Sequence, residues 1–284
     1  MKDSLPLQDR TVLITGCSSG IGYQVAKDLL RRGYKVIASA RRLEDVDRLN
    51  KEGIFTVHLD LENSSSISHA LEQTLDYANG SIYGLFNNGA YGQAGAMEDL
   101  SREAIQKQFE TNVIGWMELT NSIIPVMRKQ QYGRILFNSS VLGFVALKFR
   151  GAYTSSKYAI EGYADTLRLE LDSSNIHTSL IEPGPIETKF RENSYRMYQQ
   201  YVDRDSSFFK QEYLNSEQRL LKKGAAVPFT LPPEAITKHV IHALESKRPK
   251  ARYYVTKPTY ALGYLKRVLS SKVLDRLLLK ISNS

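Results

Sequence analysis

The sequence predicts an α/β fold in which helices cover both faces of a doubly wound parallel β-sheet. Short apolar runs alternate with segments of helical periodicity from residue 11 to about 181, which is the pattern of consecutive strand, helix and strand units. A glycine-rich turn directly follows the first apolar run. The length of 284 residues suits one large domain. We therefore expect a single three-layer α/β/α domain over residues 1–284.

The expected elements follow in a regular order along the chain. Strands are expected at residues 12–15, 35–39, 56–58, 82–86, 134–138 and 178–181. Helices are expected between them, at about residues 20–32, 43–51, 65–78, 101–129 and 154–172. A later helix at 233–246 precedes a short strand at 252–255, which would add an edge to the sheet.

Two segments near the end of the chain differ from this pattern. Residues 190–230 are polar, rich in Tyr and Lys and only loosely periodic, which is typical of a mobile lid over a substrate. Residues at about 258–281 are expected to form one basic amphipathic helix, because Lys and Arg are interspersed with apolar residues at helical spacing. The apolar positions are Leu262, Leu265, Leu269, Val273, Leu277 and Ile281.

Positive charge is concentrated in the last third of the chain. Residues 1–190 hold 20 Lys and Arg against 22 Asp and Glu, whereas residues 191–284 hold 18 against 8. No nucleic-acid-binding motif accompanies this excess, so we expect no nucleic-acid partner. The excess fits solvated surface charge, an anionic cofactor, an acidic substrate group or a membrane surface. For the last helix, the alternatives are packing in the core or in a dimer, and weak peripheral contact with a membrane.

The cellular location and the metal content can be predicted only in general terms. The sequence starts without an apolar leader and has no run of about 18 apolar residues, so we expect a cytoplasmic protein. Cys17 is the only cysteine, which excludes an internal disulfide and a cysteine-rich metal site. His239 and His242 have no third ligand in the pattern, and we expect no metal ion.

The residues from Thr15 to Gly22, T-G-C-S-S-G-I-G, lie between the first strand and the first helix. Glycines let the backbone approach a pyrophosphate, and a helix N-terminus offers unpaired N–H groups. We expect cofactor contacts from Gly16, Ser18, Ser19, Gly20, Ile21 and Gly22. The alternative is a plain tight glycine turn. The G-x-x-x-G-x-G spacing resembles that of the short-chain dehydrogenase/reductase family, which implies a Rossmann fold and a nicotinamide dinucleotide.

The end of the second expected strand predicts a preference for NADP. An acidic side chain there would accept a hydrogen bond from the ribose 2′-hydroxyl of NAD, but residues 36–42, V-I-A-S-A-R-R, contain no carboxylate. Arg41, helped by Ser39 or Arg42, would instead pair with the 2′-phosphate of NADP, and relatives that use NADP carry an arginine at this position. The alternative is that both arginines are solvated charges. Asp60 resembles the family's adenine-binding aspartate.

A tyrosine four residues before a lysine on a helix brings both side chains to one face. This spacing occurs three times, in the pairs Tyr23/Lys27, Tyr153/Lys157 and Tyr253/Lys257. Only Tyr153 and Lys157 lie near the start of a helix at the carboxyl edge of the expected sheet, where open α/β sheets bind ligands. Ser140 ends the fifth strand, thirteen residues before Tyr153. The three residues resemble the family's catalytic serine, tyrosine and lysine.

These residue types predict the interconversion of a carbonyl and an alcohol. Lys157 and a positively charged nicotinamide are expected to lower the pKa of Tyr153 from its usual value of about 10, so that Tyr153 serves as general acid or base. Ser140 would donate a hydrogen bond to the developing oxyanion. The resemblance implies that Tyr153 and Lys157 also contact the nicotinamide ribose. Asn112 resembles the family asparagine that completes a proton relay through water; the alternative is a structural amide inside a helix.

Two further segments extend the resemblance. Residues 183–188, P-G-P-I-E-T, resemble the family turn that faces the nicotinamide, with a plain proline turn as the alternative. Residues 87–90, N-N-G-A, stand where relatives usually read N-N-A-G, and this exchange leaves the backbone geometry beside the ribose open. The cofactor contacts implied by both segments are Asn88, Gly89, Pro183, Gly184, Ile186 and Thr188.

The chain most resembles the bacterial NADP-dependent aldehyde reductases that lie near the 17-beta-hydroxysteroid and retinol dehydrogenases. This resemblance implies a lipophilic aldehyde, ketone or alcohol as substrate, and a homo-oligomer formed through the helices at 101–129 and 154–172. A non-catalytic protein that senses NADP(H) would share the fold, but the intact Ser140, Tyr153 and Lys157 argue against it. Nucleotide-sugar epimerases and dehydratases generally carry T-G-x-x-G-x-x-G and a larger C-terminal domain, and this sequence has neither.

Overall fold

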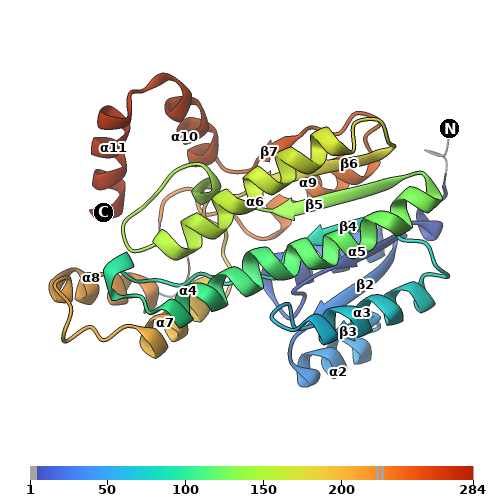
Figure 1. The fold of residues 1–284 in the computed structure, drawn as a ribbon, viewed down its shortest axis with the longest axis horizontal. Coiled ribbons are helices and arrows are strands. Elements are labelled where there is room, and N and C mark those ends of the chain that lie inside the picture. Colours follow the sequence, from blue (N-terminus) through green and yellow to red (C-terminus); the bar gives the residue numbers. More distant parts are fainter. Residues whose placement is uncertain (1–4, 222–223, 225–226, 284) are drawn as a thin grey trace.

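Seven parallel strands form one sheet in the computed structural model, which describes residues 5–221, 224 and 227–283 (Figure 1). Their order across the sheet is β3-β2-β1-β4-β5-β6-β7. The strands are β1 (Thr11–Ile14), β2 (Lys35–Ala40), β3 (Thr56–His58), β4 (Gly84–Asn87), β5 (Gly133–Asn138), β6 (Ile176–Glu182) and β7 (Arg252–Tyr254). The doubly wound parallel sheet predicted from the sequence is confirmed, including the short strand at its edge.

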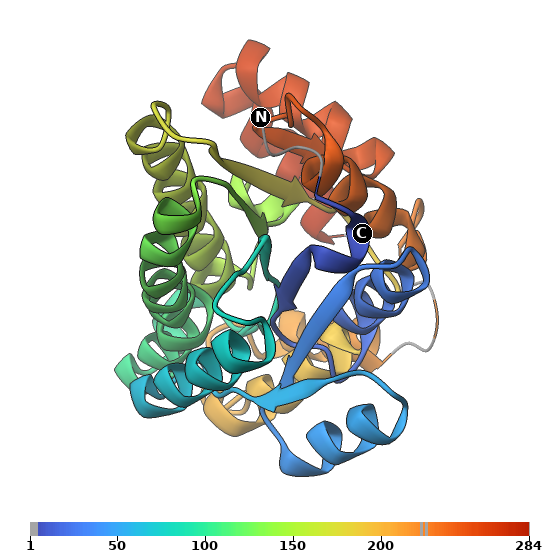
Figure 2. The same cartoon turned by 90° about the vertical axis from the view of Figure 1, so that its right-hand side faces the viewer.

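Helices cover both faces of the sheet, as Figure 2 shows from a second direction. One face carries α1 (Gly20–Arg31), α2 (Leu43–Lys51) and α9 (Glu234–Glu245); the other carries α3 (Ser64–Tyr77), α5 (Gly115–Gln130) and α6 (Gly151–Glu170). Val12 and Ile14 belong to the apolar layer of α1 and α9, whereas Leu13 between them belongs to the layer of α5 and α6. This alternation is expected for a strand that is buried on both faces.

The direction in which strands are added to the sheet reverses beside β1. The chain proceeds outward from β1 to β2 and β3, and returns to β4 on the other side of β1. Open sheets bind ligands beyond the carboxyl ends of the strands at such a reversal. Four helices lie beyond this edge in Figure 1: α7 (Phe190–Tyr201), α8 (Lys210–Leu221), α10 (Lys257–Val268) and α11 (Ser271–Asn283).

The helix expected at 101–129 is interrupted in the structure. Helix α4 (Arg102–Phe109) is followed by a π-helical turn at Glu110–Ile114 and then by α5. Gly115, the first residue of α5, packs against the backbone before α3: a Cβ on Gly115 would lie 2.1 Å from the carbonyl oxygen of Leu61. The π turn contains Asn112, and such turns often occur at functional sites.

The segment expected as a lid contains two helices, α7 and α8. Tyr198 of α7 and Tyr213 of α8 are buried in one apolar cluster with Ala94 and Ala96, in the loop after β4. The hydroxyl of Tyr213 accepts a hydrogen bond from the N–H of Ala96 at 2.7 Å. The loosely periodic tyrosines therefore anchor helices. Residues 222–223 and 225–226 of the expected lid lie outside the described residues, and the mobility of the lid stays a prediction.

The expectation of one continuous C-terminal helix at 258–281 is wrong, because the segment folds as α10 and α11. Leu269 has an extended backbone, with φ −90° and ψ 143°, and ends α10. One straight helix over this segment would be about 36 Å long and would carry one end away from the site. The break lets Leu262, Leu274 and Leu278 pack into the same buried cluster, while Val273, one of the apolar positions expected on one helix face, is 46% exposed.

Candidate active site

The glycine loop between β1 and α1 is packed too closely for side chains. Gly16 and Gly20 have φ values of +70° and +62°, in the region that favours glycine. A Cβ on Gly16 would lie 2.5 Å from Cα of Gly89, and a Cβ on Gly22 would lie 2.4 Å from the carbonyl oxygen of Gly16. Backbone contacts on both sides of the loop therefore require the observed glycine spacing.

The first turn of α1 presents N–H groups that no side chain caps. Ser19 occupies the N-cap position but makes no capping hydrogen bond, unlike Asn63 and Ser101 at the starts of α3 and α4. Because such N–H groups attract anions, this turn fits the pyrophosphate of a dinucleotide. Arg48 of α2 supports the loop by donating to the carbonyl oxygen of Ser18 at 2.8 Å.

Asn88 connects the glycine loop to β5. Its Nδ2 donates to the carbonyl oxygens of Thr15 at 2.9 Å and Gly16 at 3.2 Å, and its Oδ1 accepts from Nδ2 of Asn138 at 2.8 Å. The hydroxyl oxygen of Thr15 accepts from the N–H groups of Asn88 and Gly89, both at 2.8 Å. The Asn88 side chain thus supports the loop. A Cβ on Gly89 would lie 3.2 Å from the nitrogen of Gly16, so glycine here relieves a tight contact.

Arg41 and Asp60 lie just beyond the carboxyl ends of β2 and β3. The side chain of Arg41 is 60% exposed, and its Nη1 lies 3.9 Å from Oε1 of Glu62, so the guanidinium is accessible to a phosphate. Ser39 is buried, which leaves the exposed Arg42 as its expected helper. Oδ1 of Asp60 accepts a hydrogen bond from the N–H of Glu62 at 3.1 Å.

Ser140, Tyr153 and Lys157 meet at the carboxyl end of β5. Ser140 caps the short 3-10 turn Val141–Gly143, and its Oγ accepts from the N–H of Leu142 at 3.1 Å. Tyr153 and Lys157 lie one turn apart near the start of α6. The Ser140 side chain lowers the pKa of Tyr153 and so lies beside the phenol. Nζ of Lys157 lies 5.7 Å from the centre of the Tyr153 ring.

Lys157 is buried between the sheet and α5. Its Nζ donates to the carbonyl oxygen of Asn138 at 2.8 Å and lies 4.2 Å from the centre of the Trp116 ring. Burial lowers the pKa of Lys157 to about 7, and the charge of Glu161 acts in the opposite direction. The indole N–H of Trp116 donates to the carbonyl oxygen of Gly89 at 2.8 Å, which connects the surroundings of the lysine to the loop after β4 that packs on Gly16.

The acidity of Tyr153 differs from the expectation. Burial raises the pKa of Tyr153 to about 12, and a hydrogen bond with Ser140 and the charge of Arg150 only partly oppose this rise. For the protein chain alone, the expected lowering of the pKa is therefore reversed, because desolvation of the phenol outweighs its polar contacts. At neutral pH Tyr153 carries the proton that a general acid needs.

The amide of Asn112 is used inside the protein. Its Nδ2 donates to the carbonyl oxygen of Tyr91 at 2.8 Å and to Oγ of Ser156 at 3.2 Å, and its Oδ1 accepts from the N–H of Tyr91 at 3.2 Å. The hydroxyl of Ser156 donates to the carbonyl oxygen of Tyr153 at 2.7 Å. These contacts favour the structural alternative for the Asn112 side chain, and connect it to the turn that carries Tyr153.

The turn after β6 contacts the Ser140 turn. The carbonyl oxygen of Pro183 accepts from the N–H of Val141 at 2.8 Å. A Cβ on Gly184 would lie 2.2 Å from Oγ1 of Thr256, so this position also requires glycine. The turn is therefore fixed on one side by the Ser140 turn and on the other by the start of α10.

The same turn reaches the glycine loop through Thr188. A Cβ on Gly20 would lie 3.1 Å from Cβ of Thr188. Ile186 forms a β-bridge with Leu231, which ties the turn to the segment before α9. The structure thus brings residues from both ends of the expected cofactor site together.

Apolar side chains surround Tyr153. The ring of Phe190 meets the Tyr153 ring edge to face, with centres 5.2 Å apart and planes at 62°. The buried cluster around the tyrosine also contains Leu142, Val145, Leu262, Leu274 and Leu278. Sequence reasoning assigned no site role to Phe190, Leu274 or Leu278, because no motif marks them.

Trp116 and Glu161 were also missed, although each has a positional signal. Trp116 lies four residues after Asn112, and Glu161 lies four residues after Lys157. On a helix, this spacing places a side chain one turn from the preceding one on the same face. The residues four positions after Asn112 and Lys157 were therefore identifiable from the sequence as neighbours of the site.

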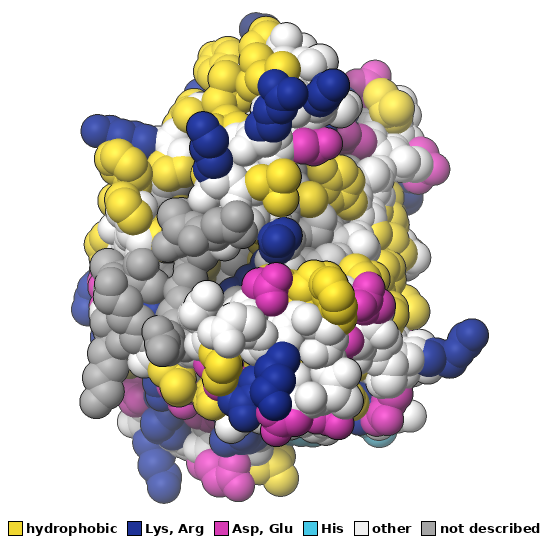
Figure 3. All heavy atoms as spheres, turned by 90° about the vertical axis from the view of Figure 1, so that its left-hand side faces the viewer, with side chains coloured by type: hydrophobic (Ala, Val, Ile, Leu, Met, Phe, Trp, Pro, Cys, Tyr) yellow, Lys and Arg dark blue, Asp and Glu magenta, His cyan; other side chains and the backbone are white. Residues whose placement is uncertain are grey.

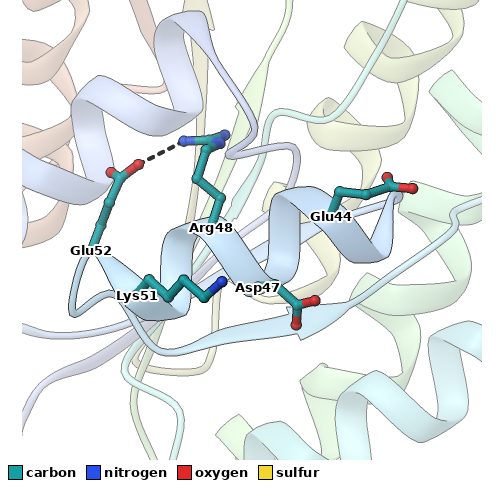
Figure 4. A pocket seen from close by; sticks show the side chains of 5 residues that line it. All are labelled: Glu44, Asp47, Arg48, Lys51 and Glu52. Atoms are coloured by element: carbon teal, nitrogen blue, oxygen red, sulfur yellow. Dashed lines mark hydrogen bonds and ion pairs between the residues drawn. The ribbon is translucent and has the colours of Figure 1, made fainter.

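A separate surface hollow lies on α2 (Figure 4). Its walls are charged, and Arg48 and Glu52 form an ion pair at 2.8 Å across it. The side chains are Glu44, Asp47, Arg48, Lys51 and Glu52. None of them belongs to the Ser140, Tyr153 and Lys157 site, and we assign no function to this hollow.

Residues 5–221, 224 and 227–283 contain no group of three or more His, Cys, Asp or Glu side chains placed to hold a metal ion. Within the same ranges, no helix is both long enough and apolar enough to span a bilayer.

A doubly wound sheet with a glycine loop at its reversal point and Ser, Tyr and Lys at the adjacent edge defines a Rossmann-type oxidoreductase. The family model described as short chain dehydrogenase matches residues 10–199. The chain belongs to this family, whose members bind a nicotinamide cofactor and interconvert alcohols and carbonyls.

Relatives extend over nearly the whole chain. An uncharacterized oxidoreductase, YbbO of Escherichia coli strain K12, is 39% identical over 272 residues, covering 96% of this chain and 95% of its own. Human retinol dehydrogenase 8 is 30% identical, covering 92% of this chain and 86% of its own. Bovine 17-beta-hydroxysteroid dehydrogenase type 6 is 33% identical, covering 87% and 80%. The resemblance to retinol and hydroxysteroid dehydrogenases expected from the sequence is confirmed.

Solved structures share the fold. A short-chain dehydrogenase from Streptomyces avermitilis superimposes with a TM-score of 0.76 at 23% identity, covering 94% of both chains. One from Burkholderia phymatum in complex with NAD has a TM-score of 0.75 at 22% identity, covering 91% of this chain and 92% of its own. One from Burkholderia cenocepacia in complex with NADP has a TM-score of 0.73 at 21% identity, covering 96% and 99%.

Proposed function

We propose that the protein is an NADP(H)-dependent oxidoreductase that interconverts a lipophilic aldehyde or ketone and its alcohol, with Tyr153 as general acid and base. The observation that carries this proposal is the buried Tyr153 side chain, which lies beside Ser140 and within an apolar cluster. A proton donor in an apolar wall suits a carbonyl attached to a hydrocarbon group. The names of retinol dehydrogenase 8 and 17-beta-hydroxysteroid dehydrogenase type 6 support a lipophilic substrate.

The proposed roles follow from the state of each side chain. The nicotinamide, when bound, supplies the hydride that adds to the carbonyl carbon. Neutral Tyr153 donates its proton to the carbonyl oxygen, while the Ser140 hydroxyl donates a hydrogen bond to the same oxygen as negative charge develops. Lys157 in its ammonium form stabilises the phenolate left on Tyr153 and holds the nicotinamide ribose. In the oxidising direction the phenolate accepts the alcohol proton.

The cofactor would extend along the carboxyl edge of the sheet. We assign its pyrophosphate to the loop and first turn of α1, its adenosine to the ends of β2 and β3, and its nicotinamide to the turn after β6. The assigned residues are Gly16, Ser18, Ser19, Gly20, Ile21 and Gly22; Arg41 and Asp60; and Asn88, Gly89, Tyr153, Lys157, Pro183, Gly184, Ile186 and Thr188. Asn112 is proposed to hold the Tyr153 turn in place for the proton relay.

The preference for NADP rests on Arg41. Its side chain is accessible, and β2 ends without a carboxylate. Replacing Arg41 by alanine should lower kcat/KM for NADPH roughly 10- to 100-fold, as expected for the loss of a charge-assisted contact, and should leave NADH little affected. Equal use of NADH and NADPH by the unaltered protein would contradict this assignment.

The activity is tested by following NADPH oxidation with aliphatic and aromatic aldehydes, retinal, steroids and ketoacyl thioesters. Tyr153→Phe keeps the ring and removes the acid, so the variant should bind NADPH and lose turnover. A non-catalytic NADP(H) sensor is the rival function. It predicts binding without substrate-dependent oxidation in the unaltered protein, and no change on Tyr153→Phe.

We propose a homo-oligomer formed through α5 and α6. Ile114, directly before α5, is 45% exposed, and Leu169 near the end of α6 is 70% exposed. Large exposed apolar side chains at the start of α5 and near the end of α6 are the residues that a partner copy would cover. Light scattering coupled to size exclusion should show a dimer or tetramer, and Leu169→Glu should shift it toward the monomer.

We also propose weak contact of α10 and α11 with an anionic membrane surface. Tyr260, Tyr264 and Val268 form an exposed stripe on α10, each separated by one turn. Exposed basic residues flank them on both helices: Lys257, Lys266, Arg267, Lys272, Arg276 and Lys280. Figure 3 shows this face, with apolar and basic side chains side by side at its top, the region of α10 and α11 in Figure 1. Such a mixture suits the interface of an anionic bilayer.

The membrane contact is tested by co-sedimentation with anionic vesicles at low salt. Binding should fall when Tyr264 and Val268 are replaced by serine, and when salt is raised. A protein that never co-sediments under these conditions would exclude the contact. The cytoplasmic location stays a prediction, to be tested by fractionation of cells that express the tagged chain.

A further inference from the structure

A group of buried charged side chains lies behind the Ser140 turn. Glu161 of α6 is 7% exposed, and Glu182 at the end of β6 has no exposed surface. Nη1 of Arg252 contacts Oε2 of Glu161 and lies 2.7 Å from Oε1 of Glu182. Nη2 of Arg252 lies 2.7 Å from Oδ2 of Asp165. Three carboxyl groups therefore surround one guanidinium.

One of these carboxyl groups needs a proton. Oε2 of Glu182 is buried and has no hydrogen-bond partner, although the carboxyl groups of Glu161 and Glu182 lie within hydrogen-bonding range of each other. A proton on Glu182 would make this carboxyl group a hydrogen-bond donor, and the neighbouring Glu161 carboxylate could accept from it. Burial and the neighbouring charge of Glu161 raise the pKa of Glu182 to about 8, which agrees with a neutral Glu182 at pH 7.

The proton belongs on Glu182 because Glu161 is surrounded by donors. The hydroxyl of Ser139 and the guanidinium of Arg252 both donate to the Glu161 carboxylate. Burial raises the pKa of Glu161, and Arg252, Ser139 and Glu182 counteract this rise. With Glu182 neutral, Glu161 is the one buried carboxylate that faces Arg252, since Asp165 is half-exposed and also pairs with Arg168. With Glu182 ionised, a second negative charge would lie beside Glu161 in the buried part of the site.

Glu161 is connected to the proposed catalytic residues through the helix and through β5. It lies one turn beyond Lys157 on the same face of α6. The neighbouring residues Asn138 and Ser139 hold the two side chains, since the Asn138 carbonyl oxygen accepts from Lys157 and the Ser139 hydroxyl donates to Glu161. A Cβ on Gly143 would lie 2.8 Å from Oε1 of Glu161, so the turn that Ser140 begins packs directly on this carboxylate.

We propose that Glu161 is the counter-charge of Lys157, and that Glu182, carrying a proton, holds the Glu161 carboxylate in place. The two residues are positioning residues, and the inference rests on the proposed role of Lys157. Other groups contribute to the same electrostatic surroundings. They are Tyr153, Asp165 and Arg168 on α6, Arg252 and Tyr254 on β7, and Arg267 on α10.

The first test compares two isosteric changes by the pH profile of carbonyl reduction. If reduction needs the charged form of Lys157, kcat/KM falls as the pH rises past the pKa of Lys157; this fall is called the falling limb. Glu161→Gln removes the charge that raises this pKa, so the falling limb should move to lower pH, by roughly one unit. Glu182→Gln keeps a hydrogen-bond donor to Glu161 and should leave the limb in place, whatever its effect on stability. Glu170→Gln, an exposed change on the same helix, is the control. An unmoved limb in Glu161→Gln, or equal shifts in both glutamine variants, would overturn the proposal.

The second test needs neither cofactor nor turnover. Infrared difference spectra of the cofactor-free Tyr153→Phe protein, titrated from pH 6 to pH 10, should show a protonated carboxyl band that is lost near pH 8 and is absent when Glu182→Gln is added. Absence of the band in Tyr153→Phe would overturn the shared proton. If the band is present but Lys157→Met keeps full activity, the proposed function fails while the protonated Glu182 stands.

Discussion

The ring of Phe190 stands edge-on to the ring of Tyr153, with centres 5.2 Å apart. Phe190 is the first residue of α7, so the segment after β6 contributes a wall of the site as well as the turn proposed to hold the nicotinamide. Helices α10 and α11 provide the opposite part of the apolar cluster. The surroundings of Tyr153 are therefore built jointly by the segment after Ser140, with Leu142 and Val145, and by the part of the chain after residue 189.

Removal of this wall should weaken the binding of large substrates. Phe190→Ala is expected to lower kcat/KM for a bulky lipophilic carbonyl roughly 10- to 100-fold, mainly through KM, because about 1.5–3 kcal/mol of apolar contact is lost. A two-carbon aldehyde should be affected much less. Phe208→Ala, at a lid position that is 86% exposed, is the matched control. An equal loss with small and large substrates would contradict a role in substrate contact.

The reduction rate should depend on the charge of Lys157. Because burial lowers the pKa of Lys157 to about 7 while Tyr153 keeps its proton to about pH 12, kcat/KM for carbonyl reduction should fall as the pH rises above about 7. Tyr153 is not the group that titrates on this limb. Lys157→Arg, whose charge persists through this range, should flatten the limb even if the maximal rate is lower.

Stability gives a check on Lys157 that does not depend on turnover. The folded-state pKa lies below the unfolded value of about 10.5, so between pH 7 and that value the unfolded chain binds more protons than the folded one. The contribution of Lys157 to the free energy of unfolding should therefore rise with pH across this window and be smallest below pH 7. Denaturation curves of Lys157→Met should lack this rise when compared with the unaltered protein; parallel pH dependences would contradict the assignment.

The glycine loop should not tolerate even a methyl group. Gly16→Ala places a Cβ 2.5 Å from the backbone of Gly89 at a φ of +70°, so NADPH binding should be abolished and the melting temperature lowered. Gly162→Ala is the control, because nothing lies within 4 Å of its Cβ position and alanine is favoured in a helix by about 0.5–1 kcal/mol. Nucleotide fluorescence titration and thermal unfolding measure both effects. Unchanged NADPH affinity in Gly16→Ala would contradict the proposed binding of the pyrophosphate by the glycine loop.

The C-terminal helices should stabilise the site through their buried leucines. Leu274→Ala is expected to lower the free energy of unfolding by about 2–4 kcal/mol and to raise KM for lipophilic substrates. Leu279→Ala, on the same helix but 46% exposed, should lower the free energy of unfolding by less than about 1 kcal/mol. Denaturant titration distinguishes them, and equal effects would mean that α11 does not pack on the site.

The sheet and the helices next to it could be predicted because each is defined by a local pattern. The glycine spacing at Gly16, Gly20 and Gly22 reflects contacts within one loop and with Gly89. Tyr153 and Lys157 could be chosen over two other pairs because position relative to the sheet follows from the order of the elements. Such features depend on residues close in sequence or on the regular alternation of strands and helices.

Other features depend on contacts between distant segments. The break at Leu269 has no glycine or proline to mark it, since it is determined by where Leu262 and Leu274 find apolar partners. The contact of Glu161 with Arg252 joins residues 91 positions apart. The raised pKa of Tyr153 follows from burial by Phe190 and the C-terminal leucines, so its direction could not be obtained from the Tyr–Lys spacing.

The two C-terminal helices have a consequence for synthesis of the protein. A ribosome produces α10 and α11 after the sheet and the glycine loop, yet Leu262, Leu274 and Leu278 of these helices complete the cluster around Tyr153. Until these two helices have been made, this part of the cluster around Tyr153 is missing. A chain that stops before α11 would still contain all seven strands and the glycine loop, but it would lack Leu274 and Leu278, which cover Tyr153.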